Sequence, residues 1–224
     1  CITYGTKIIF TSSMAVYGDQ TPPFTEDKRP QPIDPYGIAK YAVECDLKLA
    51  HEQFGLRYNI VRPHNVLGVY QNIWDRYRNV IGIFIRKALN GQPILVYGDG
   101  EQTRAFSDIK YYMEPFDKLL TGHDGETFNI GADKHFSLNE VAITVQTIAA
   151  KYGYHVNIEH GEPRHEVKHA FCDHTKAKTL LNFEDNTNLA DLIESVFVWA
   201  MKQPNRKVKD MEYEVTKDIY EYWK

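Results

Sequence analysis

The chain has 224 residues, of which 43% are hydrophobic and 25% charged, and this ordinary globular composition excludes a disordered, collagen-like or disulfide-framework protein. Lys and Arg total 26 against 30 Asp and Glu, a formal charge of −4 without a basic stripe, so we expect no nucleic-acid partner. The sequence contains no apolar run of about 18 residues, so it predicts no membrane span. The three cysteines, Cys1, Cys45 and Cys172, are far apart and fit reduced thiols in a cytoplasmic protein.

Short apolar runs alternate with helical patterns along the first half of the chain. Asp34 and Pro35 are a natural helix cap and first helical residue, and Gly55 is a natural stop. Ser137 and Glu140 form a capping box for a later helix. We predict strands over residues 8–11, 56–61, 94–97 and 128–130, and helices over 36–54, 80–89, 112–120, 137–151, 175–181 and 189–201.

Strand–helix–strand alternation predicts βαβ units and a parallel sheet, hence an α/β fold. Ligands of such sheets bind at the carboxyl ends of the strands. Ser12 and Ser13 follow the first strand, and His64 and Asn65 follow the second. These polar residues are therefore placed where chemistry would occur.

Tyr36 and Lys40 are four residues apart near a helix start, so their side chains share one helix face. A free tyrosine has a pKa of about 10 and is a poor base at pH 7, and lowering that value by about 3 units takes about 4 kcal/mol. One cation about 4 Å away supplies energy of that order at an effective dielectric of about 20. With Ser13 beside them, the pair could remove an alcohol proton while hydride leaves the carbon.

A Tyr-x-x-x-Lys spacing alone usually means only a helix surface, but here it stands between two further motifs. Residues 12–18 read SSMAVYG, residues 34–40 read DPYGIAK, and residues 62–68 read RPHNVLG. Together these motifs resemble the extended short-chain dehydrogenase/reductase family. Within it the chain is similar to NAD-dependent nucleotide-sugar epimerases, above all the UDP-glucose 4-epimerases, over roughly residues 7–185.

The resemblance implies a fold, a cofactor and a substrate class. It implies a partial Rossmann-type sheet over 1–67, a smaller mixed α/β sugar-nucleotide domain over 68–224, and a return of about 105–130 to the Rossmann domain. The cofactor would be NAD and the substrate a UDP-sugar, epimerised at C4 through a 4-keto sugar. A homodimer through the helix bearing Ala42, Val43, Leu47 and Leu49 is a further implication.

The resemblance also assigns roles to single residues. Ser13, Tyr36 and Lys40 would be catalytic, and Lys40 would also hold the nicotinamide ribose. Arg104 and Arg164 would bind the diphosphate, because the planar guanidinium group of arginine can hydrogen-bond phosphate oxygens in pairs. Cofactor contacts would come from Ser12, Tyr36, Lys40, Pro63 and His64; substrate contacts would come from Ser13, Asn65, Asn79, Val80, Leu95, Tyr97, Arg104, Arg164 and Glu166.

Related dehydratases and decarboxylases generally carry an acid just after the catalytic Ser or Thr. Met14 and Ala15 stand there instead, which favours reversible oxidation and reduction over elimination. Ala170 lies near the position that admits or excludes an N-acetyl group, so glucose-type and N-acetylated sugars both remain open. A different NDP-sugar epimerase or a dehydratase is the alternative within enzymes.

Two departures from the family pattern stand out. No G-x-G-x-x-G fingerprint occurs, since Gly98 and Gly100 are followed by Thr103, and we expect about 110 preceding residues to be absent. Residues 106–112 read FSDIKYY, in which Lys110 and Tyr111 break the usual run before a helix. Two alternatives to an enzyme therefore stay open: a non-catalytic protein that binds a sugar nucleotide or dinucleotide, and an inactive fragment.

Four histidines, His160, His165, His169 and His174, recur near one another in the sequence. They lack a partner carboxylate pattern, so we expect no metal site.

Overall fold

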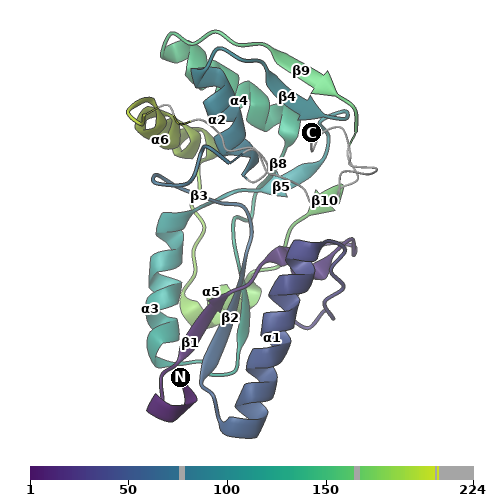
Figure 1. The fold of residues 1–224 in the computed structure, drawn as a ribbon, viewed down its shortest axis with the longest axis vertical. Helices are drawn as coiled ribbons and strands as arrows, with labels where there is room; N and C mark the ends of the chain where they lie inside the picture. Colours follow the sequence, from purple (N-terminus) through teal and green to yellow (C-terminus); the bar gives the residue numbers. More distant parts are fainter. Residues whose placement is uncertain (76–78, 164–166, 205, 207–224) are drawn as a thin grey trace.

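The computed structural model describes residues 1–75, 79–163, 167–204 and 206. It has two lobes stacked along the long axis of the molecule, with short strands between them (Figure 1). The chain crosses between the lobes repeatedly, so each lobe is assembled from segments far apart in the sequence.

The lower lobe is built on a parallel three-stranded sheet in the order β1-β2-β7, formed by Ile8–Thr11, Tyr58–Pro63 and Thr127–Ile130. Helix α1 (Pro35–Phe54) packs on one face of the sheet (Figure 1), where Leu47 meets Tyr58 and Ile60. Helices α3 (Met113–Thr121) and α5 (Thr175–Leu181) cover the other face, to which Val61 points. Because both faces are covered, β2 is almost a continuous buried run.

Local sequence signals fix both ends of α1. The carboxylate of Asp34 accepts a hydrogen bond from the backbone N–H of Gly37 at 2.6 Å, and Pro35 takes the first helical turn, where no N–H is needed. Gly55 ends the helix at a φ of 68°, a left-handed conformation that glycine adopts at little cost. These caps place Tyr36 and Lys40 in the first turns of the helix.

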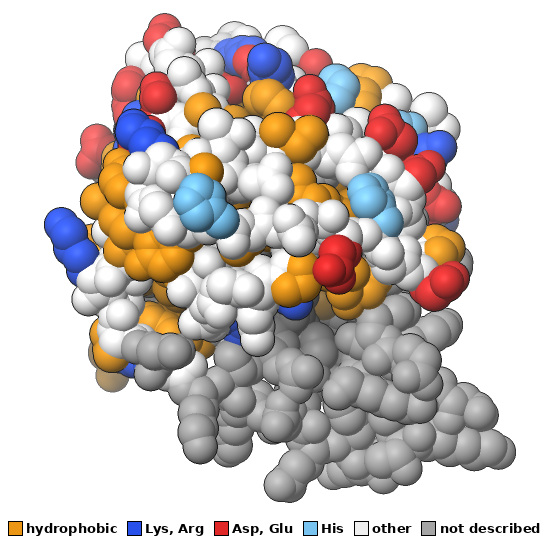
Figure 2. Space-filling view, turned by 90° about the horizontal axis from the view of Figure 1, so that it is seen from above, with side chains coloured by type: hydrophobic (Ala, Val, Ile, Leu, Met, Phe, Trp, Pro, Cys, Tyr) orange, Lys and Arg blue, Asp and Glu red, His pale blue; other side chains and the backbone are white. Residues whose placement is uncertain are grey.

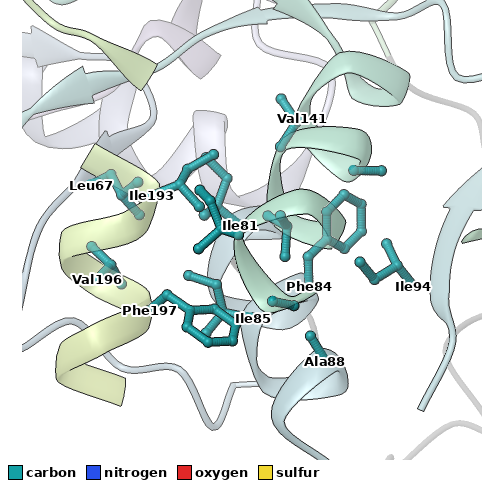
Figure 3. Packing of buried hydrophobic residues seen from close by; sticks show 14 of the residues in the cluster. Leu67, Ile81, Phe84, Ile85, Ala88, Ile94, Val141, Ile193, Val196 and Phe197 are labelled. Atoms are coloured by element: carbon teal, nitrogen blue, oxygen red, sulfur yellow. The ribbon is translucent and has the colours of Figure 1, made fainter. Parts of the chain in front are cut away.

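The upper lobe packs three helices against a parallel strand pair. The helices are α2 (Val80–Leu89), α4 (Leu138–Lys151) and α6 (Leu189–Met201), and the strands are β4 (Ile94–Tyr97) and β9 (Ile158–Gly161). Figure 3 shows Phe84 and Ile85 of α2 among side chains from α6 and β4. Each large apolar side chain buried here contributes about 1.5–3 kcal/mol relative to exposure, so this core holds the upper lobe together.

Short strands join the two lobes. β3 (Val66–Leu67) pairs with β6 (Ser107–Asp108), and β5 (Thr103–Ala105) lies between β10 (His169–Ala170) and β8 (His135–Ser137). Three single-turn 3₁₀ helices, η1 (Ile2–Tyr4), η2 (Met14–Tyr17) and η3 (Ile109–Tyr112), complete the described elements.

The predicted α/β class and the presence of the long elements are confirmed, but the strand predicted over 56–61 lies at Tyr58–Pro63 and one helix start is corrected. The capping box of Ser137 and Glu140 is present as predicted. The helix predicted from residue 112 begins at Met113, after η3, because Asp108 caps the tighter turn by accepting from the Lys110 backbone N–H at 3.0 Å. The short strands were not predicted.

The upper end of the molecule carries mixed chemistry. Figure 2 shows acidic, basic, histidine and apolar side chains interspersed over the described part of that face. None of the helices in the described part of the chain is long and apolar enough to cross a membrane.

Candidate active site

Strand β1 and helix α1 bring the predicted catalytic residues to one edge of the lower sheet. Ser13 follows β1 and caps η2, its Oγ accepting from the Ala15 backbone N–H at 3.2 Å. Gly37 of α1 lies so close to η2 that an added Cβ would meet the Ala15 oxygen at 2.7 Å. The glycine therefore permits the approach that sets Tyr36 beside the strand end carrying Ser13.

Lys40 is held between the helix and the strand. Its Nζ donates to the Thr11 carbonyl oxygen at 2.8 Å and lies 5.8 Å from the ring centroid of Tyr36 and 5.0 Å from that of Phe10. The Tyr36 side chain is half exposed. The ammonium and the half-exposed phenol are therefore placed together at an open site.

A pocket of about 410 Å³ opens at this edge of the sheet. It receives side chains from the lower lobe, from the segments that follow its strands, and from the strands between the lobes. The described residues that line it are Ser13, Met14, Ala15, Gly18, Phe24, Ile33, Asp34, Tyr36, Pro63, Asn65, Arg104, Val167 and Ala170. The structure thus gathers five of the predicted site residues at one cavity: Ser13, Tyr36, Pro63, Asn65 and Arg104.

Asn65 and Arg104 stand on the side of the pocket formed by the connecting strands. Asn65 has a φ of 39°, and its Nδ2 donates to the Ala105 carbonyl oxygen at 2.9 Å. Arg104 donates from Nη1 to the carbonyl oxygens of Thr103 and Lys168, at 2.8 and 3.2 Å. A backbone-anchored guanidinium at a pocket wall is suited to a phosphate or diphosphate.

Other predicted residues are placed away from this lining. Ser12 is buried, and His64 is buried against His174. Asn79 caps α2 by accepting from the Gly82 N–H at 3.5 Å. Val80 packs against the upper core, while Leu95 and Tyr97 flank Gly161 in the β4–β9 pair. Arg164 and Glu166 lie outside the described residues.

His64 and His174 form a buried, stacked pair. Burial lowers the pKa of both rings, and each is held neutral although Asp133 opposes the shift. A neutral His174 donates from Nδ1 to Asp133 at 3.1 Å, which leaves its Nε2 to accept from His64 Nε2 at 2.7 Å. His64 Nδ1 is then an acceptor, and it is buried without a hydrogen-bond partner among the described residues.

A buried ion pair that was not predicted from the sequence lies beneath the site. Arg62 and Glu44 are both buried, with Arg62 Nη2 2.6 Å and Nε 2.9 Å from the two carboxylate oxygens. Arg62 also donates to the Tyr17 hydroxyl at 2.8 Å. Two signals were available: Arg62 interrupts an apolar strand, and Glu44 stands eight residues after Tyr36 on the same helix face.

The profile of the NAD dependent epimerase/dehydratase family matches residues 1–131. The chain belongs to this family. The matched residues include the lower sheet, helix α1 and the edge at which Ser13 and Tyr36 meet. The match confirms the resemblance found in the sequence.

Similar proteins in this family are named for different reactions. A UDP-glucose 4-epimerase structure with UDP-glucose, from Thermotoga maritima, has a TM-score of 0.80 and 31% identity, covering 90% of this chain and 65% of that one. A UDP-glucuronic acid 4-epimerase from Bacillus cereus, in complex with UDP-glucuronic acid and NAD, has a TM-score of 0.77 and 27% identity. The match covers 86% of this chain and 60% of that one. A UDP-N-acetyl-alpha-D-glucosaminuronate decarboxylase of Bacillus cytotoxicus is 33% identical over 89% of this chain and 65% of its own length. The chain spans just under two thirds of the length of these curated relatives.

The donor set at the strand ends fits the nicotinamide end of NAD, the cofactor of the family. A hydroxyl, a phenol and an ammonium converge at the carboxyl edge of a parallel sheet, where dinucleotides bind. The G-x-G-x-x-G segment that would hold the pyrophosphate is not among the 224 residues. The fit therefore concerns Tyr36 and Lys40 and the ribose and ring they would face.

Proposed function

We propose that this chain carries the catalytic and sugar-nucleotide-binding part of an NAD-dependent UDP-hexose 4-epimerase. The observation that supports this most is that Ser13 and Tyr36, from different elements, line one pocket with Arg104, while Lys40 lies against the Tyr36 ring. The pocket, at about 410 Å³, is within the range of small-molecule sites.

In the proposed reaction Tyr36 removes the proton from the sugar O4. The Lys40 ammonium stabilises the phenolate, and Ser13 hydrogen-bonds the same sugar oxygen. NAD, when bound, would supply hydride transfer at C4. The resulting 4-keto sugar would turn in the pocket, so that hydride returns to its other face. Tyr36 then gives the proton back to O4, so the cycle leaves the protein unchanged.

The substrate contacts are assigned to residues in and behind the pocket wall. Arg104 and Asn65 would hold the diphosphate, with Pro63 beside the nicotinamide. Ser12 and His64, both buried, would support that wall from behind. Asn79, Val80, Leu95 and Tyr97 are proposed for the uridine end, and Arg164 and Glu166 remain predictions outside the described residues.

Epimerisation is favoured over elimination by the residues around Ser13. Met14 and Ala15 line the pocket directly after it. Among the described lining residues the one carboxylate is Asp34, and it is engaged as the cap of α1. Ala170 leaves a small side chain at the wall, so glucose-type and N-acetylated UDP-sugars both fit the proposal.

Location and assembly are proposed on separate grounds. Cys1, Cys45 and Cys172 are unpaired, which suits a reducing, cytoplasmic compartment. Val43 and Leu49 of α1 are exposed, whereas Leu47 is buried. A homodimer face on α1 would therefore use Val43 and Leu49 and not Leu47.

The test is interconversion of UDP-glucose and UDP-galactose by the chain in the presence of NAD. Tyr36→Phe is expected to lower kcat at least 100-fold, within the usual contribution of a general base. Tyr4→Phe, at a side chain that is 87% exposed in η1, is the matched control and is expected to behave as wild type.

The same preparation separates the alternatives. Binding of UDP-sugar without interconversion would favour a non-catalytic binder. Saturating NAD at about 100 times its Kd raises the free energy of unfolding by about 2.7 kcal/mol. If neither NAD nor UDP-sugar shifts the unfolding midpoint, the chain is an inactive fragment.

A further inference from the structure

Three side chains on one face of α1 point toward the end of strand β1. Tyr36, Lys40 and Glu44 follow one another at intervals of four residues, so they lie above one another on the helix. Lys40 Nζ bonds the Thr11 carbonyl oxygen at 2.8 Å, and Glu44 Oε1 accepts from the Ser12 hydroxyl at 2.5 Å. The helix is therefore attached to the strand at two consecutive residues, immediately before Ser13.

Glu44 is the centre of a buried polar network. Its carboxylate is 0% exposed and receives two hydrogen bonds from Arg62 and one from Ser12, which are 1% and 2% exposed. Arg62 continues to the Tyr17 hydroxyl at 2.8 Å, which donates to Asn129 Oδ1 at 2.8 Å. The network thus connects α1 with β1, η2, β2 and β7.

Stability alone is a weak reason for such a pair. Taking two charges out of water costs several kcal/mol each, and well-packed apolar residues often replace buried ion pairs without loss of stability. Three directional hydrogen bonds, in contrast, fix the distance and register between two elements in a way that apolar packing does not. Arg62 is also followed directly by Pro63, which lines the pocket.

We propose that Glu44 is a positioning residue, which holds the strand end bearing Ser13 in register with the helix face bearing Tyr36 and Lys40. The proposal rests on the proposed function, since it assumes that these three residues act on one substrate oxygen. Glu44 touches neither the pocket nor the reacting atoms among the described contacts. Its effect is carried by Ser12 on one side and by the helix on the other.

The test compares three variants of the 224-residue chain. Glu44→Leu with Arg62→Met removes both charges together, and Glu44→Gln keeps the shape of the side chain if the double variant fails to fold. Ser137→Ala, which removes a helix cap in the upper lobe, is the control for a general loss of stability.

Two readouts are taken: the kinetic constants for UDP-glucose with NAD, and amide hydrogen exchange of residues 11–17 and 35–41. We expect kcat to fall about 10-fold to 100-fold with KM within twofold, because a displacement near 1 Å at reacting groups has effects of this size. Exchange in both segments is expected to accelerate, whereas Ser137→Ala changes neither kcat nor these segments.

A kcat within twofold of wild type, or exchange in both segments unchanged, would overturn the proposal. If wild type shows no turnover, the proposed function of this chain fails. In that case exchange alone decides whether Glu44 holds the two elements in register: acceleration confined to these segments supports it and no change overturns it.

Discussion

His64 and His174, which are 110 residues apart in the sequence, stack with their ring centroids 4.8 Å apart and their Nε2 atoms 2.7 Å apart. The contact joins the end of β2, beside the pocket, to the residue that precedes α5. Because both rings are buried and carry lowered pKa values, the pair requires both histidines to be neutral.

This pair predicts a loss of stability in mild acid. The unfolded chain takes up protons near the ordinary histidine pKa of about 6.5, whereas the folded pair does so only at lower pH, so stability falls as pH drops through that range. Between pH 8 and pH 6 we expect a loss of up to about 0.8 kcal/mol per ring. Urea unfolding at the two pH values measures it.

A variant pair separates this effect from other titrating groups. His64→Phe with His174→Leu is expected to flatten the dependence between pH 8 and pH 6, while His155→Asn, at an exposed position, is expected to leave it unchanged. A double variant with the slope of wild type would assign the acid sensitivity to other residues.

Gly37 predicts a steric effect at the start of α1. An alanine Cβ there would meet the Ala15 oxygen at 2.7 Å and Pro32 Cβ at 2.9 Å, so η2 and α1 must separate. We expect Gly37→Ala to cost about 1–3 kcal/mol, the usual range for overpacking, and to reduce turnover as well. Gly122→Ala, whose nearest neighbour would be 3.8 Å away, is the control in chemical denaturation.

Asp34 tests the assignment of reaction type. As a helix cap it can be replaced by Asn with little loss, because asparagine caps as well as aspartate, whereas Asp34→Ala costs about 1 kcal/mol. We therefore expect Asp34→Asn to keep turnover within threefold of wild type. A 100-fold loss on Asp34→Asn at unchanged stability would give this carboxylate an acid–base role, and elimination would become the better proposal.

Replacing Arg104 is expected to weaken substrate binding without changing the rate of the chemical step. Hydrogen bonds to charged groups contribute about 1.5–3 kcal/mol, so Arg104→Gln is expected to weaken UDP-sugar binding by about 10-fold to 100-fold with little change in kcat. Isothermal titration with UDP-glucose measures it. Arg57→Gln, which loses an exposed pair with Asp124 at the far end of the lower sheet, is expected to bind like wild type.

Elements with signals in their own sequence were predictable. Asp34 and Gly55 bound α1, and Ser137 with Glu140 begins α4, because caps act within a few residues. β5 was not predictable, since its three residues form a strand only by pairing with β8, at least 30 residues away, and with β10, more than 60 residues away. Their hydrogen bonds depend on tertiary structure.

The same distinction applies to the candidate site. Ser13, Tyr36 and Lys40 follow strand or helix ends and carry a recognisable spacing. Glu44 shares the helix face of Tyr36, but its buried position becomes evident only when Arg62 and Ser12 are placed against it. His64 was expected at the pocket, but a partner 110 residues later directs its ring into the interior.

The repeated crossing between the lobes has a mechanical consequence. The chain forms β2 below, α2 above, α3 and β7 below, α4 and β9 above, α5 below and α6 above. A single peptide cleavage in any one of these connections leaves both halves interlocked through the others. The connecting strands that carry Arg104 and Ala170 of the pocket wall lie at these crossings, so the wall is covalently linked to both lobes by more than one segment of the chain.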